Sequence, residues 1–318
     1  MMTLSKLAKM AHVSLSTASK AFSMSSEVNE ETREMIFNIA REHGCFKKFY
    51  NAKYPKLVIA VICPEFKSRY YSSLVSSIQE NLSQMGCEIC VASTDFSPKS
   101  RIELYDYYNN YSNVDGIILV DSGNDNIAEN NVPVVTSGKS NGKMVSVSSN
   151  SSTGIKLALE YFLSKNIKDI GFIGESRTLS KLKIFREYLN ENHVEINEDY
   201  ISVSNERMED GGYKAMESLF RRNAVPRAIL CAYDCLAIGA IRCILDHGLR
   251  VPEDIAVIGM NNNRESEFLN PPLSSVDLCS EKIGEEMSKA IVNKLMGIST
   301  PDKITIEPRL ILRKSSEI

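Results

Sequence analysis

The sequence lacks the long apolar runs of membrane proteins, because none approaches the roughly 20 residues that a spanning helix needs. It does not open with a secretory signal, so we expect a cytoplasmic protein. It also lacks a strong net charge, since 37 Lys and Arg stand against 40 Asp and Glu. With 43% hydrophobic residues, the 318-residue chain is able to bury a sizeable core, which excludes a disordered polymer. The length fits about two domains with a small extra module.

The motifs of common enzyme classes are missing as well. The segment GFIG lacks the third Gly of a dinucleotide-binding loop, and Gly211-Gly212 stands alone. There is no nucleophile elbow and no HExxH, and the four His residues are scattered, with no obvious general base among them. We therefore expect no enzymatic activity and no cofactor.

Eight cysteines are present, mostly inside apolar runs. Cys87 and Cys90 make one CxxC pair, but no second pair follows at the spacing of a zinc site. Cytosolic thiols stay reduced, and a buried Cys behaves as a small hydrophobic residue. We therefore interpret the cysteines as structural and expect no metal.

Charge is distributed unevenly along the chain. Residues 1–56 hold nine basic and five acidic side chains, a net charge of +4, while the other 262 residues carry 28 basic and 35 acidic ones, or −7. The first acid is Glu27, so we expect Lys6, Lys9 and Lys20 to be unopposed. A basic arm on an acidic body indicates contact with nucleic acid through the arm.

The N-terminal residues carry the start signals of three short helices. Thr3 is a suitable N-cap for an apolar periodic segment, and Ser14 is a second one in front of residues 15–22. Asn29 caps a third helix. Because a tight turn joins the first two, the pattern predicts an all-α helix-turn-helix domain over residues 1–44.

Residues 45–56, CFKKFYNAKYPK, are basic and aromatic without clean periodicity, and we interpret them as a linker. From Leu57 onward, apolar strand segments alternate with helical segments, which predicts an α/β architecture with parallel sheets covered on both faces. This region, 57–318, holds too many strands for one open sheet, so we expect two lobes. Their expected ranges are about 57–149 with 277–302 for the N-lobe, and about 150–276 with 303–318 for the C-lobe.

Several segments carry a family resemblance. They are TLSKLAKMAHVSLSTASKAF and VNEETREMIFNIAREHG near the start, then VDGIIL, VPVV, SSNSSTGIKLALEYFLSKNIKDIGFIG, CAYDCLAIGAIRCILDHGLRVPEDIAVIGM and NPPLSSVD. In this order and spacing they resemble the LacI/GalR family of bacterial transcription regulators over nearly the whole chain. The resemblance implies a helix-turn-helix DNA-binding domain. It also implies a two-lobed, periplasmic-binding-protein-like domain for effector binding and dimerisation.

The resemblance assigns roles to side chains of the second helix, whose N-terminal residues would face base edges in the major groove. The positions that match base readers are Leu15, Ser16 and Lys20. Leu15 suits a thymine methyl, and Lys20 suits guanine although the family commonly has Arg there. The positions that match phosphate contacts are Ser14, Thr17, Ser19, Asn29 and Thr32. For Ser14 and Asn29 the alternative is plain helix capping, and both roles are compatible.

Two segments depart from the family pattern. His12 stands where relatives often have Gly, and a left-handed His is tolerable, so we expect the turn to hold. The linker is about three residues shorter than the hinge of relatives and has no Leu at the place of their minor-groove wedge. The alternative wedges are Phe49, Tyr50 and Tyr54, and the alternative phosphate contacts are Lys47, Lys48 and Lys53. We favour a flexible basic tether over these contacts.

The effector pocket of the family lies in the cleft between the lobes and usually takes a sugar or a nucleobase-like metabolite. The corresponding positions here have lost three carboxylates, now Gly138, Ser149 and Asn261, which removes the common sugar clamp. The expected pocket residues are Tyr70, Tyr71, Ser149, Asn150, Lys181, Tyr233 and Asn261. This set suits an anionic or more apolar ligand, with Lys181 pairing a phosphate or carboxylate. The alternative is a vestigial pocket, with control by a protein partner or by expression level.

The predicted function is therefore that of a homodimeric transcription regulator, most simply a repressor, on a pseudo-palindromic DNA operator. A small-molecule effector would modulate its DNA affinity by altering lobe closure. One alternative is the same regulator with a vestigial pocket and a protein partner. The other is a cytosolic small-molecule-binding protein without DNA function, which the basic helical arm disfavours.

Overall fold

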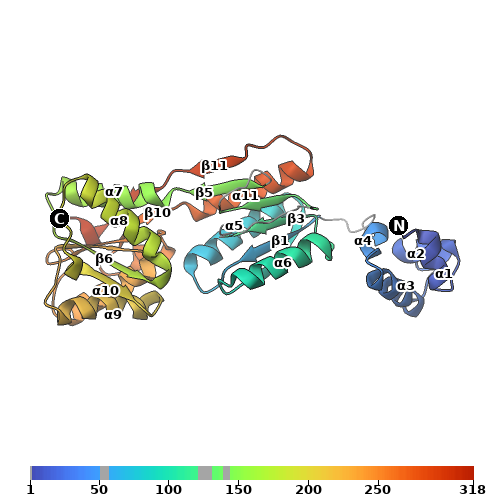
Figure 1. Ribbon diagram of the computed structural model, residues 1–318, viewed down its shortest axis with the longest axis horizontal. Helices are drawn as coiled ribbons and strands as arrows, with labels where there is room; N and C mark the ends of the chain where they lie inside the picture. Colours follow the sequence, from blue (N-terminus) through green and yellow to red (C-terminus); the bar gives the residue numbers. More distant parts are fainter. Residues whose placement is uncertain (1, 51–56, 121–130, 139–143) are drawn as a thin grey trace. The chain divides into compact units, whose positions relative to one another are not determined.

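The computed structural model describes residues 2–50, 57–120, 131–138 and 144–318 (Figure 1). Its first part is a compact module of four helices: α1 (Leu4–Met10), α2 (Leu15–Phe22), α3 (Glu30–Glu42) and α4 (Phe46–Tyr50). The side chains of Thr3, Ser14 and Asn29 cap the first three helices, as predicted. His12 holds the turn with a φ of 52°, so the departure from Gly is accommodated.

Residues 46–50, the first part of the expected linker, belong to the helical module. Residues 46–50 are not a tether, because they form α4 and add Phe46, Phe49 and Tyr50 to the core of the module. The Phe46 ring lies edge-on to Phe37 at 5.0 Å between centroids, and Phe49 lies 5.6 Å from Phe22. The sequence pattern hid this helix because a five-residue segment is too short to show periodicity.

The first α/β sheet has the strand order β11-β5-β4-β3-β1-β2. Its strands are β1 (Leu57–Cys63), β2 (Cys87–Ser93), β3 (Gly116–Leu119), β4 (Val134–Thr136), β5 (Val145–Ser149) and β11 (Lys303–Ile306). Successive residues of β1 point to opposite faces. Ala60 and Ile62 pack with Tyr105 of α6 (Pro98–Asn110). Ile59 lies beside Ile291 of α11 (Ser280–Leu295), which packs against α5 (Arg69–Gln84) through Ser77.

The second sheet has the order β12-β10-β9-β8-β6-β7. Its strands are β6 (Ile170–Glu175), β7 (Ile201–Ser204), β8 (Ala228–Cys231), β9 (Ala256–Met260), β10 (Ser274–Asp277) and β12 (Arg309–Ile311). Figure 1 shows two helices on each side of it: α7 (Ser151–Ser164) with α8 (Leu179–Glu191), and α9 (Met208–Arg221) with α10 (Asp234–Asp246). Short 3₁₀ turns complete it at Ser176–Thr178, Glu198–Tyr200, Arg264–Phe268 and Lys314–Ser316.

The two sheets share one topology. In each, the first strand lies between the second and the third, and the fourth and fifth strands follow in order, giving β2-β1-β3-β4-β5 and β7-β6-β8-β9-β10. Pairing is parallel throughout the second series, while β12 is antiparallel to β10. In such sheets, ligands bind beyond the carboxyl ends of the strands where the order reverses. In the second sheet that point lies between β6 and β8.

The chain divides into two compact units: residues 1–66, 78–146 and 287–302 form the first, and residues 67–77, 147–286 and 303–318 form the second. The α/β prediction with parallel sheets is confirmed. Two strands, β5 and β10, were not predicted, because their Ser-rich sequences VSVSS and SSVD lack a clear apolar run. No helix in the described ranges is long and apolar enough to cross a membrane.

Candidate DNA interface and polar site of the second unit

Helix α2 has one buried and one exposed face. Ala18, Ala21 and Phe22 are buried against the other helices. Leu15, at the first position of the helix, leaves 53% of its surface exposed, and Ser16 beside it is exposed too. The N-terminal end of α2 therefore presents side chains that the fold of the module does not use.

The predicted phosphate contacts have a clear structural role. Ser14 Oγ accepts a hydrogen bond from the backbone N of Thr17 at 2.9 Å, and Asn29 Oδ1 accepts one from Thr32 N at 2.8 Å. Both residues therefore cap helices, as the alternative in the sequence analysis had it. Ser14, Ser19 and Asn29 are also exposed, while Thr17 and Thr32 are half-buried.

The expectation that Lys20 is unopposed is wrong. Its Nζ forms an ion pair with Glu27 Oε2, although seven positions separate the two residues. The chain turns back after α2, which is why sequence distance concealed the contact. Lys20 remains half-buried at the edge of the exposed face.

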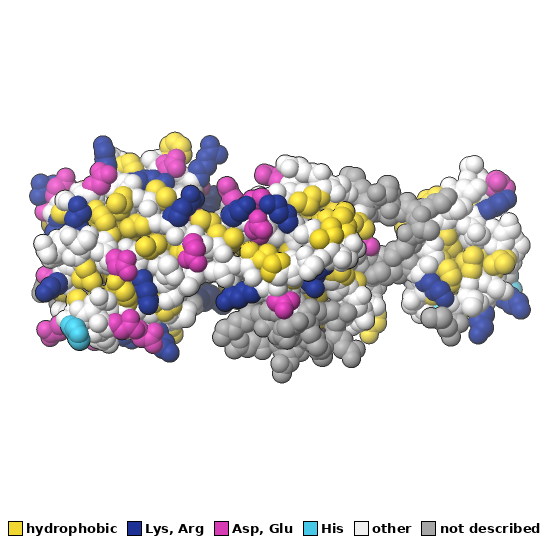
Figure 2. Space-filling view, turned by 90° about the horizontal axis from the view of Figure 1, so that it is seen from above, with side chains coloured by type: hydrophobic (Ala, Val, Ile, Leu, Met, Phe, Trp, Pro, Cys, Tyr) yellow, Lys and Arg dark blue, Asp and Glu magenta, His cyan; other side chains and the backbone are white. Residues whose placement is uncertain are grey.

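Helix α4 takes up several of the residues that were expected to contact DNA from the linker. Phe49 and Tyr50 pack inside the module, so they do not serve as wedges in this structure. Lys48 Nζ donates to the carbonyl of Met2 at 2.9 Å and lies 5.6 Å from the Phe49 ring centroid. Lys53, Tyr54 and the side chain of Lys47 lie outside the described part of the chain. On the face shown in Figure 2, the helical module displays more Lys and Arg than Asp and Glu, whereas the α/β part displays both signs.

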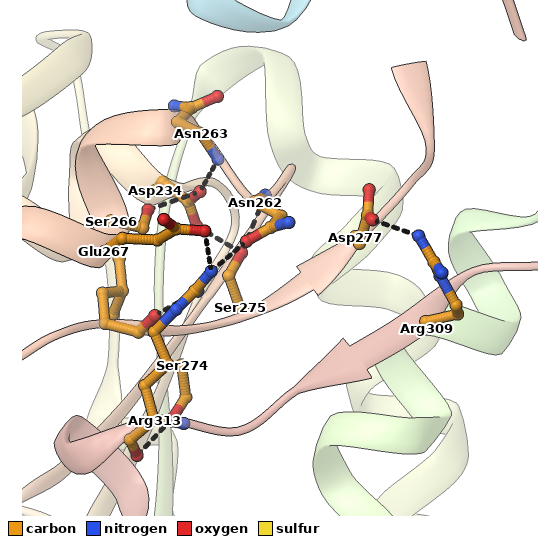
Figure 3. A network of polar contacts seen from close by, with 11 residues as sticks. Asp234, Asn262, Asn263, Ser266, Glu267, Ser274, Ser275, Asp277, Arg309 and Arg313 are labelled. Carbon is orange, nitrogen blue, oxygen red and sulfur yellow. Dashed lines mark hydrogen bonds and ion pairs between the residues drawn. The ribbon is translucent and has the colours of Figure 1, made fainter. Parts of the chain in front are cut away.

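A buried polar network occupies the carboxyl edge of the second sheet (Figure 3). Asp234, the first residue of α10, has no exposed surface. Its carboxylate accepts hydrogen bonds from Ser275 Oγ at 2.6 Å, Asn263 N at 2.6 Å and Ser266 Oγ at 3.0 Å. Burial raises the pKa of Asp234 to about 7, against these hydrogen bonds, which lower it. Gly259 is required here, because a Cβ would stand 2.2 Å from Asp234 Oδ1.

One arginine extends this network and a second forms a separate pair near it. Arg313 donates to Asn262 Oδ1 at 2.9 Å and to the carbonyl of Leu273 at 2.8 Å, and it pairs with Glu267 at 3.2 Å (Figure 3). Arg309 of β12 pairs with Asp277 of β10 at 2.9 Å. The C-terminal strand and turn are thereby fixed to the end of the sheet.

Lys181 and Tyr233 lie where the strand order reverses, as the topology suggests for ligand contacts. Lys181 Nζ donates to the carbonyl of Ala232 at 2.7 Å, just after β8. Burial lowers the pKa of Lys181 to about 8, while the charges of Asp234 and Glu175 raise it. The Tyr233 hydroxyl accepts from the backbone N of Met208 at 3.1 Å. The Lys181 ammonium, which the sequence suggested as the partner of an anionic ligand, thus already donates a hydrogen bond within the protein.

A cavity of about 720 Å³ opens within the second unit. Of its lining residues seven are Ser or Asn, four are basic and four are acidic. Ser72, Ser73 and Ser76 of α5 contribute one side, and Asn261 to Asn263 contribute another. Arg69 pairs with Glu265 at its rim at 3.1 Å. The lining offers many donors and acceptors with balanced charge.

The expected pocket residues are only partly brought together. Asn261 lines the cavity, and Lys181 and Tyr233 lie at the neighbouring strand ends. Asn150 caps α7, and Ser149 Oγ is buried without a hydrogen-bond partner among the described residues. Tyr70 packs against the core of the second unit with Tyr71 edge-on to it.

Sequence reasoning missed the serines and arginines of this cavity. Ser72, Ser73 and Ser76 recur at helical spacing, which was the available signal. Arg69 lies one turn before these serines on α5 and shares their spacing, whereas Arg309 carried no signal because it reaches the cavity from the distant strand β12.

The fold and the site together define a class of protein. A helical module with an exposed reading helix precedes two doubly wound α/β sheets, one of which carries a polar cavity at its strand ends. This is the organisation of a DNA-binding transcription regulator with an effector-binding domain.

Comparison with known proteins agrees. The family model "Bacterial regulatory proteins, lacI family" matches residues 3–45, and "Periplasmic binding protein-like domain" matches residues 159–316. The chain is 30% identical to "Probable HTH-type transcriptional repressor ExuR" of Bacillus subtilis (strain 168), with 89% of this chain and 88% of the relative covered. It is 27% identical to "HTH-type transcriptional regulator DegA" of the same organism, with 99% and 98% covered. These relatives are named as transcription regulators, not as enzymes.

Solved structures show the same fold. A "transcriptional regulator CelR-cellobiose complex" superposes with a TM-score of 0.71 at 25% identity, covering 99% of this chain and 100% of the other. A lac repressor dimer bound to operator and the anti-inducer ONPF gives 0.74 at 21% identity, with 99% of each chain covered. The chain belongs to the lacI family of bacterial regulatory proteins, and it is a DNA-binding transcription regulator.

Proposed function

We propose that the protein acts as a homodimeric repressor, with each protomer placing the N-terminal end of α2 in one major groove of a pseudo-palindromic operator. The observation that carries this proposal is the exposed pair Leu15 and Ser16 at the start of a capped helix. The exposed half of the Leu15 side chain is not used in packing, and it suits contact with a thymine methyl. Relatives named as repressors support the direction of regulation. Because operator DNA lies in the bacterial cytoplasm, the proposal includes that location.

The test is selection of bound sequences from a pool of randomised duplex DNA by the full-length protein. We expect a pseudo-palindromic motif, and we expect Ser16→Ala to relax one base position in each half-site. Asn38→Ala on α3 is the matched control, because Asn38 is exposed and, among the described residues, its side chain bonds only to Arg41. Sedimentation at micromolar concentration checks the dimer. A monomer, or selection of no motif, contradicts the proposal.

We propose further that a small polar metabolite is the effector and that it occupies the cavity of the second unit. Hydroxyl and amide groups line that cavity, its charges are balanced, and Lys181 lies at the adjacent strand ends. This lining favours a ligand with many hydroxyl or amide groups over a strongly anionic one. The alternative hypothesis is that the pocket is vestigial and that a protein partner controls the regulator.

Thermal unfolding against a panel of sugars, sugar phosphates, nucleobases and carboxylates tests this proposal. Asn261 has a φ of 99°, so Asn261→Gly removes its amide without backbone strain. We expect a compound that raises the melting temperature of the wild type and loses its effect in Asn261→Gly. If Lys181→Met alone abolishes the effect, the anionic pairing predicted from the sequence is favoured instead. No shift across the panel supports the vestigial pocket.

A further inference from the structure

The recognition helix carries a single charged side chain, and that side chain is paired. Helix α2 has the sequence LSTASKAF, so Lys20 is its only ionisable residue. Its ammonium contacts the carboxylate of Glu27, in the loop between α2 and α3. The two side chains keep 41% and 65% of their surface exposed. The pair therefore lies on the surface of the module rather than in its core.

The loop that carries Glu27 is folded back by a defined turn. Met24 has a φ of 51°, and the backbone N of Ser25 donates to the carbonyl of Lys20 at 3.0 Å. Met24 N donates to the carbonyl of Ala21 at 3.1 Å. These two bonds form the Schellman arrangement that ends a helix and reverses the chain. Glu27 is thereby returned to the level of the last turn of α2.

A buried arginine then fixes the loop. Arg33 of α3 is only 8% exposed, and its guanidinium donates to the carbonyls of Ser25 at 2.8 Å and Val28 at 2.9 Å. Both acceptors flank Glu27, and the side chain of Val28 is buried as well. The backbone position of Glu27 is thus set by the core of the module. Its contact with Lys20 follows from the fold and does not depend on a mobile loop.

The pair contributes little to folding, because an exposed ion pair stabilises a protein only weakly. Its position at the reading helix makes DNA binding the property that it can affect. A carboxylate at a DNA interface is repelled by phosphates, and it neutralises the one cation of the recognition helix. In the absence of Glu27, a flexible Lys side chain would bind any phosphate within reach, which adds affinity without sequence information.

We propose that Glu27 is a specificity-determining residue of the DNA interface. It holds the Lys20 ammonium in one direction, toward a base edge, and it lowers the affinity of the module for DNA of arbitrary sequence. Glu27 acts here through Lys20 and is a positioning residue. The inference rests on the proposed reading of bases by α2, and it adds a residue outside that helix to the recognition code.

The experiment compares the wild type with Glu27→Gln in the full-length protein. Binding to a mixed-sequence duplex is measured over a range of salt concentrations, and bound sequences are selected from a randomised pool. For Glu27→Gln we expect roughly three- to tenfold tighter binding to the mixed-sequence duplex at low salt. The slope of log K against log[salt] should steepen by about 0.9, since one more phosphate is neutralised. The selected motif should lose the same base preference that Lys20→Ala loses.

Glu42→Gln is the control, because it removes one carboxylate from the same module at the far end of α3 and has no ion pair in the described structure. It should change neither the motif nor the salt slope. The inference is overturned if Glu27→Gln keeps both the motif and the slope, or if it weakens binding to every DNA. Melting temperatures of both variants exclude a folding defect. A wild type that selects no motif overturns the proposed function and this inference together, whereas a motif that survives Glu27→Gln overturns this inference alone.

Discussion

Two carboxylates of this protein, one in each part of the molecule, differ in burial and in the number of their hydrogen-bonding or charged partners. Asp234 in the second unit is fully buried, and three hydrogen-bond donors surround it. Glu27 in the helical module is 65% exposed and has one cation partner. A buried charge must have its partners in the fold, because unsatisfied polar groups are costly in a low-dielectric interior. An exposed ion pair contributes little to the free energy of unfolding, so an exposed carboxylate can serve recognition of a macromolecular partner instead.

The largest predicted effect concerns the buried carboxylate, Asp234. Asp234→Ala should lower the free energy of unfolding of the second unit by about 4 kcal/mol, since it leaves three donors of Asn263, Ser266 and Ser275 without their acceptor. Urea denaturation measures it. Asp254→Ala is the control in the same unit, because Asp254 forms a surface pair with Arg250, and it should lose much less stability. Equal losses would remove the contrast between buried and exposed carboxylates.

The pH dependence sharpens the same contrast. The pKa of Asp234 is raised from 3.8 to about 7, so between these values the folded state binds a proton that the unfolded state has released. The stability of the second unit should therefore fall as pH rises from about 4 to 7, by no more than about 1.4 kcal/mol per pH unit, and level off above. Lys181, with its pKa lowered to about 8, acts in a separate window, where stability rises from pH 8 to 10.5.

Asp234→Asn cannot titrate and should abolish the decline between pH 4 and 7. Denaturant midpoints of wild type and variant at half-unit pH steps provide the measurement. Parallel profiles for the two proteins would show that another group carries the pH dependence. Glu27→Gln, which changes a carboxylate of the helical module, serves as the reference profile.

A third prediction concerns the boundary of the helical module. Phe49→Ala should destabilise it by about 2 kcal/mol, because a half-buried ring leaves the cluster around Phe22. Hydrogen exchange of the α2 and α3 amides in the full-length chain reports the loss. Phe66→Ala removes a ring that is 50% exposed and should leave that exchange unchanged. If Phe49→Ala leaves the hydrogen exchange unchanged, residues 46–50 do not stabilise the module and act as a tether.

The sequence predicted the parts of the fold that local chemistry determines. The caps at Thr3, Ser14 and Asn29 were correct because capping depends on a side chain and a backbone group only three residues apart. The α/β alternation was correct because buried strands have continuous apolar runs. Strands β5 and β10 were missed because their partners, not their composition, make them strands.

The site was less predictable for a related reason. The pairing of Lys20 with Glu27 depends on a chain reversal at Met24, and the network of Asp234 draws its three donors from two separate segments. Neither follows from spacing along the chain. The family resemblance suggested Lys181 and Asn261 as pocket residues, but it did not show that Ala232 already accepts a hydrogen bond from Lys181.

The smallest predicted effect separates the two roles of Ser14. Ser14→Ala removes the acceptor of Thr17 N and should lower the stability of the module by about 1 kcal/mol. Ser14→Asp keeps an acceptor at the N-cap and places a negative charge where the helix dipole favours one, so the stability should equal that of the wild type. If the exposed Ser14 also contacts a phosphate, Ser14→Asp should nevertheless bind DNA at least tenfold more weakly, because the new carboxylate repels the backbone. Thermal unfolding and binding to a mixed-sequence duplex, measured on both variants, distinguish the outcomes. Full DNA affinity in Ser14→Asp would restrict this side chain to capping and leave Leu15 and Ser16 as the first residues of the interface.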